Sequence, residues 1–270
     1  MELSFRKYGE SGPPIIIVHG LYGASDNWIG IARELSENYE VYVIDQRNHG
    51  DSPKDDVHTY DVMREDLREF MDQHEIDTAI LMGHSMGGKT VMSFAMHYPE
   101  RIISLLVIDI APVSYIDFSL GSHTSAHHSK MIDAMLELDL KKMDSRDEVF
   151  RALATNIGSE RIRMFLLKNL TRDQEKNFCW KINLPVLKKY LNEIMDGLPM
   201  DEFIANGGVS GFPVAFIRGE NSDYIQAKDN DTIKKLFPTA EIVSIPNSGH
   251  WVHAEQPKLL VKNVLYFLRS

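Results

Sequence analysis

The chain has 270 residues, 43% of them hydrophobic, which is enough apolar material for a sizeable core in one domain. Its 29 basic and 39 acidic side chains give a formal net charge of −10, which repels phosphate backbones and anionic lipid surfaces, so we expect neither nucleic acid nor a membrane as a partner. The single cysteine, Cys179, excludes an internal disulfide, and the opening stretch MELSFRKYGE lacks the apolar segment of a secretory signal, so we expect a cytoplasmic protein.

Short runs rich in Ile, Val and Leu recur along the chain, and each ends in a polar or glycine-containing turn. Runs that are apolar on both faces are typical of parallel strands covered by helices on each side of a sheet. Between them, apolar residues recur at spacings of three and four, as in amphipathic helices. The alternation predicts an α/β fold with a mostly parallel central sheet flanked by helices. In chain order we expect strands at 15–18, 41–44, 79–82, 103–108, 214–217 and 242–245, and helices at 27–38, 60–74 and 88–100.

The interval between the fourth and fifth predicted strands breaks this alternation. It contains no clear buried strand, and four stretches in it carry an apolar stripe opposite a charged face. These stretches predict helices at 129–143, 145–157, 159–171 and 184–197. The sequence therefore predicts a helical cap at 114–211, inserted before the penultimate strand of an α/β-hydrolase core that comprises 1–113 and 212–270.

The stretch LMGHSMGGKT places a serine between glycines directly after a predicted buried strand. Residues 83–87, GHSMG, fit the pattern G-x-S-x-G of a nucleophile elbow, in which a sharp strand-to-helix turn exposes the serine oxygen. A serine between glycines is common in ordinary turns. Its position after a strand and before an amphipathic helix favours catalysis, so we predict Ser85 as a nucleophile.

The same stretch also matches the phosphate-loop pattern G-x-x-x-x-G-K-[ST], as GHSMGGKT. A nucleotide-binding loop needs an acidic magnesium ligand, whereas a serine nucleophile needs a base, which in the elbow fold follows the last strand. The loop IPNSGHWVHAEQP supplies His250 at this place, and His253 is a competitor further into the loop. We predict His250 as the base, and hydrolysis as the class of reaction.

An acyl-transfer site also needs two backbone N–H groups that bind the oxyanion of the tetrahedral intermediate. Met86 follows the nucleophile and begins a predicted helix, so its N–H is one expected donor. The turn HGLYG follows the first predicted strand, and we expect the N–H of Leu21 to be the second donor.

The acid that orients the histidine has two candidates. In this fold it commonly follows the penultimate strand, where RGENSDY places Ser222 at the expected position and Asp223 one residue later, on the opposite side of an extended turn. Asp109 instead ends the apolar strand that follows the nucleophile strand, where a carboxylate needs a partner. We expect Asp109 to be the acid with Ser222 hydrogen-bonded to the site, and Asp223 remains the alternative.

With these features together, the chain resembles the α/β-hydrolase superfamily over nearly its full length, and within it the YbfF esterases and the abhydrolase-domain 11 group. The resemblance rests on the stretches VHGLYG, DQRNHGDSP, GHSMGGK, VIDIAPV, GENS and GHWVHAEQP. It implies a triad of Ser85, His250 and Asp109 with Ser222 alongside. It also implies a serine hydrolase that cleaves short to medium acyl esters or acyl thioesters, and we expect an acyl-enzyme intermediate.

Other functions remain open on the residues alone. A cofactor-free C–C hydrolase or a perhydrolase uses the same triad, and a non-catalytic ligand-binding protein keeps the same fold. A metal site at His123 and His127 would need a third ligand that the sequence does not offer nearby. We expect no metal and no cofactor, a small-molecule substrate, and a bracing role for Asp45, Arg47 and His49 in the loops around the site.

Overall fold

The computed structural model describes residues 1–116 and 125–269 of the chain. Seven strands form one sheet in the order β1-β3-β2-β4-β5-β8-β9. Neighbouring strands run parallel except β1, which pairs antiparallel with β3, so the predicted mostly parallel sheet is confirmed. The strands are β1 (Phe5–Tyr8), β2 (Pro14–Val18), β3 (Glu40–Ile44), β4 (Ala79–His84), β5 (Ile102–Ile108), β8 (Val214–Gly219) and β9 (Ala240–Ile245).

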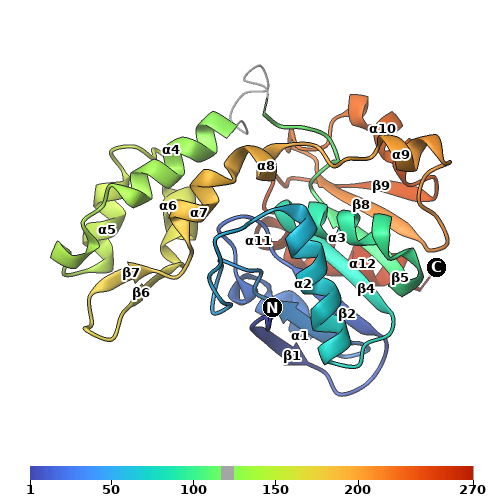
Figure 1. Ribbon diagram of the computed structural model, residues 1–270, viewed down its shortest axis with the longest axis horizontal. Helices are drawn as coiled ribbons and strands as arrows, with labels where there is room; N and C mark the ends of the chain where they lie inside the picture. The colour runs from blue at the N-terminus through green and yellow to red at the C-terminus, as the bar shows by residue number, and fades with distance from the viewer. Residues whose placement is uncertain (117–124, 270) are drawn as a thin grey trace.

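Helices cover both faces of the sheet (Figure 1), because successive side chains of a strand point to opposite sides. Ile16 and Val18 of β2 belong to the same apolar core as residues of α2, α3 and α10. Ile15 and Ile17 belong to a second core, with residues of α1 and α12. These helices are α1 (Ile29–Leu35), α2 (Tyr60–Gln73), α3 (Met86–His97), α10 (Asn230–Leu236) and α12 (Pro257–Phe267), with the short α11 (Val252–Glu255) before the last.

The interval between β5 and β8 holds a separate group of helices, which stands beside the open end of the sheet (Figure 1). Two of them begin at serine caps, where Ser145 accepts from the Glu148 N–H at 3.2 Å and Ser159 accepts from the Ile162 N–H at 3.4 Å. The helices are α4 (Ser125–Leu136), α5 (Arg146–Leu153), α6 (Glu160–Leu167), α7 (Leu184–Lys189), α8 (Leu191–Met195) and α9 (Asp201–Ala205). The last of these lies beside α10 of the core, away from the others (Figure 1).

Some elements differ from the sequence expectations. The interval contains an antiparallel pair of three-residue strands, β6 (Leu170–Arg172) and β7 (Phe178–Trp180), where only helices were expected. The expected helix at 184–197 is two helices, α7 and α8, that meet at Tyr190. Strand β1 was not expected, because its side chains are largely exposed and form no apolar run. Short 3₁₀ turns lie at Ser25–Trp28, Pro99–Arg101, Leu140–Lys142 and Ala227–Asp229.

The two ends of the inserted segment run side by side at its base. The Tyr115 N–H donates to the Met195 carbonyl at 2.7 Å, and the Leu198 N–H donates to the Pro112 carbonyl at 2.9 Å. Backbone hydrogen bonds therefore join the two ends of the insertion close to the core, near the carboxyl end of β5.

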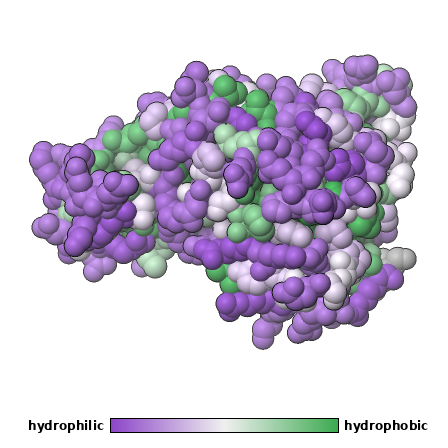
Figure 2. All heavy atoms as spheres, turned by 60° about the horizontal axis from the view of Figure 1, so that its bottom comes forward, coloured by the Kyte–Doolittle hydropathy of each residue, from purple (hydrophilic) through white to green (hydrophobic). Residues whose placement is uncertain are grey.

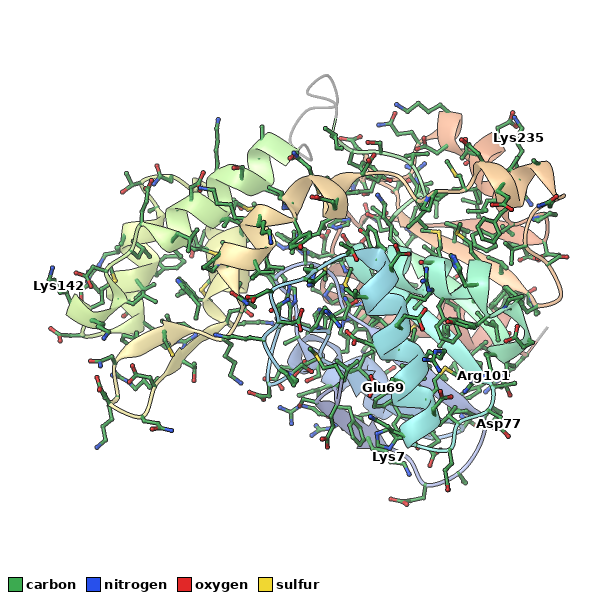
Figure 3. All side chains as sticks on the ribbon, in the orientation of Figure 1. Lys7, Glu69, Asp77, Arg101, Lys142 and Lys235 are labelled. Carbon is green, nitrogen blue, oxygen red and sulfur yellow. The ribbon has the colours of Figure 1, made fainter. Side chains whose placement is uncertain are left out.

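The surface is largely polar on the face that Figure 2 shows, with apolar side chains in small separated groups. In Figure 3 the exposed Lys142 marks the far end of the inserted helices, and Lys235 lies at the opposite end of the molecule, on α10. No helix of the described part of the chain is both long and apolar enough to cross a bilayer.

Candidate active site

The nucleophile candidate Ser85 lies in a sharp turn between β4 and α3. Its backbone has φ 54° and ψ −120°, a conformation that is rare for a residue with a side chain. The chain passes close to β2 here: a Cβ on Gly87 would lie 2.3 Å from the Val18 carbonyl oxygen, so only glycine fits. The Ser85 N–H donates to the Ile108 carbonyl at 3.0 Å, which fixes the turn against β5.

Three of the expected residues lie in one hydrogen-bonded chain. Nε2 of His250 lies 3.1 Å from Oγ of Ser85, and Nδ1 of His250 lies 2.8 Å from Oδ2 of Asp109. One nitrogen of the imidazole therefore faces the serine hydroxyl, whose proton it can accept, and the other nitrogen faces the carboxylate. This is the geometry in which a histidine acts as a general base for a serine hydroxyl.

Asp109 is fully buried and follows β5 in a turn with φ 51°. Its Oδ1 accepts from the Gly219 N–H at 2.8 Å, and its Oδ2 also accepts from the Ser222 hydroxyl. Burial raises the pKa of Asp109 to about 6, and the hydrogen bonds from Ser222 and Gly219 oppose that rise. The expected hydrogen bond of Ser222 to the site is present. The alternative acid, Asp223, has an exposed side chain, and its carbonyl accepts from Gln226 Nε2 at 3.1 Å.

The ring and the backbone of His250 are held by residues that the sequence did not single out. The Tyr224 ring stacks on the imidazole, with 3.8 Å between the ring centroids and 20° between the planes. Nε2 of His84 donates to the His250 carbonyl at 2.8 Å. Burial lowers the pKa of His84 to about 3, so this donor is a neutral imidazole. Tyr224 comes two residues after Ser222 in the sequence, and nothing in the pattern marks it as a neighbour of the base.

The expected oxyanion donors, Leu21 and Met86, are buried next to Ser85. Neither backbone N–H donates to another described residue, so both remain available to a substrate oxygen. The Tyr22 N–H is already bonded, to Nε2 of His49 at 3.3 Å. A Cβ on Gly20 would lie 3.0 Å from the Ser85 Cβ, which shows how closely the turn before Leu21 approaches the nucleophile. Two unbonded N–H groups close to the serine are what an oxyanion hole requires, so the geometry supports the prediction.

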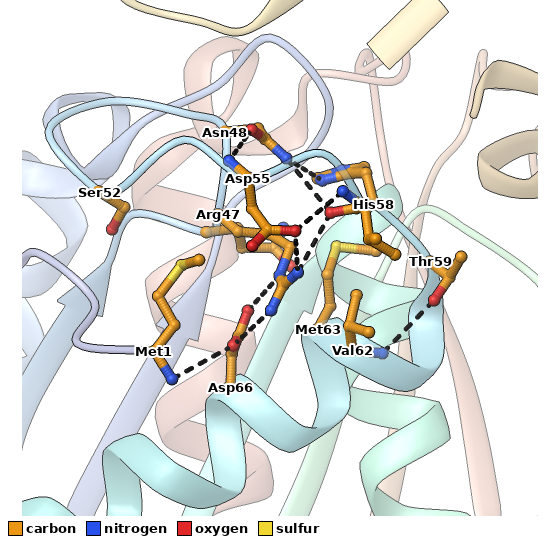
Figure 4. A network of polar contacts seen from close by, with 12 residues as sticks. Met1, Arg47, Asn48, Ser52, Asp55, His58, Thr59, Val62, Met63 and Asp66 are labelled. Atoms are coloured by element: carbon orange, nitrogen blue, oxygen red, sulfur yellow. Dashed lines mark hydrogen bonds and ion pairs between the residues drawn. The ribbon is translucent and has the colours of Figure 1, made fainter. Parts of the chain in front are cut away.

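The stretch DQRNHGDSP supports the loops around this site by buried polar contacts. Nη2 of Arg47 donates to Oδ1 of Asp66 at 2.8 Å, and both side chains are largely buried within the network drawn in Figure 4. Oδ1 of Asp45 accepts from the Ser25 N–H at 2.6 Å. Nε2 of His49 accepts from the Tyr22 N–H, in the turn after β2. These contacts join the loop after β3 to α2, to the turn at Ser25 and to the turn after β2, which agrees with the predicted bracing role.

Lys89, the lysine of the phosphate-loop pattern, is bonded inside the fold. Its buried amine donates to the carbonyls of Val113, at 2.9 Å, and of Asp196, at the two ends of the inserted segment. Burial lowers the pKa of Lys89 to about 7. Because the amine is already used inside the fold, this geometry disfavours a nucleotide-binding loop.

The alternative of a metal site at His123 and His127 finds no support in the described residues. His123 lies outside the described residues, and His127 lines the pocket described next. Within residues 1–116 and 125–269, no group of three or more His, Cys, Asp or Glu side chains is placed to hold a metal ion.

A pocket of about 460 Å³ opens onto Ser85 and His250 between the core and the inserted helices. This volume is in the usual range for sites that bind small molecules. Its apolar wall comes from Trp28, Met131 on α4, and Ile162, Phe165 and Leu166 on α6. The acyl or alcohol part of a substrate would therefore contact side chains of the cap.

Comparisons with known proteins agree with this geometry. The family model described as "alpha/beta hydrolase fold" matches residues 13–257. The chain is 33% identical to a protein named sn-1-specific diacylglycerol lipase ABHD11 of Xenopus laevis, over 100% of this chain and 85% of that protein. It is 34% identical to the protein named Esterase YbfF of Escherichia coli, over 95% of this chain and 93% of that protein.

Among solved structures, a marine microorganism esterase is 43% identical and superposes with a TM-score of 0.92, covering 98% of this chain and 99% of that chain. The matched family model covers nearly the whole chain, from the first parallel strand to the loop that carries His250. The chain therefore belongs to the family of proteins with the alpha/beta hydrolase fold, and within it is related to the ABHD11 and YbfF esterases.

Proposed function

We propose that this protein is a serine hydrolase that cleaves carboxylic esters through an acyl-enzyme intermediate. The observation that carries the proposal is the hydrogen-bonded chain from Ser85 through His250 to Asp109, of which Ser85 and His250 line the pocket. The relatives named esterase or lipase support an ester-hydrolysing enzyme. An intact serine–histidine–carboxylate chain does not favour a binding protein without catalysis.

The geometry leads to a two-step reaction. Nε2 of His250 takes the proton of Ser85 as Oγ attacks the acyl carbonyl, and the N–H groups of Leu21 and Met86 bind the resulting oxyanion. The protonated imidazole then gives its proton to the leaving alcohol, which leaves the acyl group on Ser85. Water, deprotonated by His250, releases the acid and restores the serine.

The substrate is proposed to be a small ester with a short to medium acyl chain, and an acyl thioester is the alternative. The apolar side chains of α4 and α6 in the pocket suit an acyl chain, and a volume of about 460 Å³ limits its length. Diacylglycerol, which the name of one relative indicates, is a further substrate to test. C–C hydrolysis and perhydrolysis, which use the same triad, would require a different electrophile or nucleophile in this pocket.

Three further expectations stay proposals. The division into a core at 1–113 and 212–270 and a cap at 114–211 is supported by the separate group of helices from α4 to α8, whereas α9 lies beside α10 of the core. The cytoplasmic location is supported by the presence of a single cysteine, Cys179. The absence of a nucleic acid partner is supported by the net charge of −10.

The decisive experiment compares the parent protein with Ser85→Ala on p-nitrophenyl acetate, p-nitrophenyl butyrate and an aryl thioacetate. We expect the variant to lose at least about 10⁴-fold in kcat, because the nucleophile is removed. Ser93→Ala is the matched control, since Ser93 is a buried serine on α3, the helix that begins directly after Ser85. Equal rates in the parent and Ser85→Ala would defeat the proposal, and the ratio of ester to thioester rates decides between the two substrate classes.

A further inference from the structure

We propose that Arg161 on the cap helix α6 and Glu255 on α11 are positioning residues for His250, so that the placement of the cap sets the orientation of the catalytic base. This inference rests on the proposed function, because it gives His250 the role of base. It assigns to the cap a part in catalysis besides shaping the pocket.

The first link runs through the residue before His250. Oε2 of Glu255 accepts from the Gly249 N–H at 2.7 Å, and Oε1 of the same carboxylate lies 2.9 Å from Nη2 of Arg161. The Glu255 side chain is 17% exposed, so the carboxylate is largely shielded from water while it makes both contacts. One carboxylate therefore connects the cap helix to the backbone directly before the base.

The second link runs through the residue after His250. The guanidinium of Arg161 lies 5.1 Å from the centre of the Trp251 ring, within the range of a cation–π contact. The Phe165 ring, one helical turn further along α6, lies 5.3 Å from the same indole. The helix α6 thus holds both neighbours of His250, and Arg161 takes part in both contacts.

The core also holds this loop, because the Asn221 N–H donates to the Ser248 carbonyl at 2.8 Å and Oε2 of Glu220 accepts from the Asn247 N–H at 3.0 Å. Residues 247–251 lie in a loop between β9 and α11, where no ladder of backbone hydrogen bonds fixes them. From the core, His84 donates to the His250 carbonyl and Tyr224 stacks on the ring. Since the imidazole must reach Ser85 and Asp109 at the same time, a small displacement of its backbone lengthens at least one of those two hydrogen bonds, and such displacements reduce rates steeply.

Arg161 also lines the pocket, so contact with the substrate is the competing explanation for any effect of its replacement. The two explanations differ in how the effect depends on the substrate. A positioning role acts through His250 and lowers kcat for every ester to the same degree. A binding role raises KM, and does so more for long esters that reach the mouth of the pocket than for an acetate.

The test variants are Arg161→Met, Glu255→Gln and the two changes combined. Arg161→Lys is the conservative variant, and Arg151→Met, at an exposed arginine of the cap helix α5, is the matched control. Glu255→Gln keeps an acceptor for the Gly249 N–H and removes the charge that pairs with Arg161. Each is assayed with p-nitrophenyl acetate, butyrate and octanoate. Hydrogen exchange by mass spectrometry on peptides spanning 247–256 measures the order of the loop independently of activity.

We expect kcat to fall roughly 3- to 10-fold in Arg161→Met and Glu255→Gln, equally for the three esters, with KM unchanged within about twofold. The double variant should be about as slow as Arg161→Met, because Glu255→Gln acts through the pair with Arg161, which is then already absent. Arg161→Lys should recover part of the rate, and Arg151→Met should match the parent. Exchange in the loop should be faster in the two single variants than in the parent.

Unchanged kcat and unchanged exchange would overturn the inference while the esterase function stands. A loss that appears in KM and grows with the length of the acyl chain would also overturn it, since Arg161 would then bind the substrate. If the parent protein hydrolyses none of the esters, the proposed function fails, and the exchange measurement alone decides whether the cap orders the loop.

Discussion

Nδ1 of His250 lies 2.8 Å from Oδ2 of Asp109, the residue that directly follows β5, whereas the exposed Asp223 comes after β8. We therefore expect Asp109→Asn to lower kcat by about 10³- to 10⁴-fold, as loss of the orienting carboxylate does in serine proteases. Asp223→Asn should stay within about twofold of the parent. Steady-state rates on p-nitrophenyl butyrate provide the measurement, and a larger loss in Asp223→Asn would reverse the assignment of the acid.

The hydroxyl of Ser222 shares that same carboxylate oxygen. Burial raises the pKa of Asp109 to about 6, and the hydrogen bond from Ser222 lowers it. In Ser222→Ala the pKa of Asp109 should rise further, so the carboxylate gains a proton closer to neutral pH and no longer supports the imidazolium. The profile of kcat/KM between pH 5 and 9 should begin its fall on the acid side at a higher pH than in the parent. Ser244→Ala, at an exposed serine of β9, is the control; overlapping profiles for the parent and Ser222→Ala would contradict the argument.

Buried neutral histidines should make the fold sensitive to acid. Burial lowers the pKa of His58 to about 3, below the value of about 6.5 expected in the unfolded chain. Between these values only the unfolded chain holds the proton, so the free energy of unfolding should fall as the pH drops below about 6.5, by up to about 1.4 kcal/mol per pH unit. The raised pKa of Asp109 has the opposite effect on the free energy of unfolding, which it increases as the pH drops. This contribution is the same in the parent and in His58→Gln, so it cancels in their comparison.

The comparison is between the parent and His58→Gln in urea unfolding at pH 7 and pH 5. The loss of stability over this range should be about 2 kcal/mol smaller in the variant, because one histidine no longer takes up a proton on unfolding. The same substitution at the exposed His97 is the control. Equal losses in the parent and His58→Gln would show that His58 is not responsible.

The pair of Arg47 and Asp66 in Figure 4 is buried, with the two side chains 9% and 5% exposed. We expect Arg47→Met to lower the free energy of unfolding by about 3 kcal/mol, because the buried Asp66 carboxylate loses both hydrogen bonds from the guanidinium and keeps only the N-terminal amine, 3.6 Å away, as a charged partner. Arg47→Met combined with Asp66→Leu should recover much of that loss. Arg6→Met, which breaks an exposed pair with Asp26, should cost at most about 1 kcal/mol. Urea unfolding gives the free energy of unfolding of the parent and the three variants. Only a small loss in Arg47→Met would show that this pair does not stabilise the fold.

The fold was predictable where the sequence repeats one simple physical pattern. Ile15, Ile16 and Ile17 are apolar on both faces of β2 because helices cover both sides, and a run of this kind is visible without a structure. The ends of the strands were harder to predict from the sequence. Gly83 and His84 continue β4 beyond the expected end at Met82, since pairing with Val107 and Ile108 depends on the backbone and not on apolar side chains.

The candidate site was predictable where a residue belongs to a local motif. The family, the fold and the hydrolase class are confirmed by the comparisons, and the roles of Ser85, His250 and Asp109 stay predictions that the distances support. The partners of the base were not predictable. Tyr224 and Arg161 reach His250 and its neighbours only because β8 and the cap helix α6 pack around the loop after β9, and no periodicity encodes that packing.

The amine of Lys89 lies where the inserted segment leaves the core and where it returns, through the carbonyls of Val113 and Asp196. Lys89 belongs to the helix that begins directly after Ser85, and its N–H donates to the Ser85 carbonyl at 3.1 Å, so the anchor of the insertion lies one helical turn from the serine. The chain between the two anchored carbonyls can therefore lengthen, shorten or be exchanged for that of another enzyme without moving the serine. This junction is a natural site for grafting a foreign cap and so changing substrate preference, provided that the new cap supplies a counterpart of Arg161 to hold the loop that carries His250.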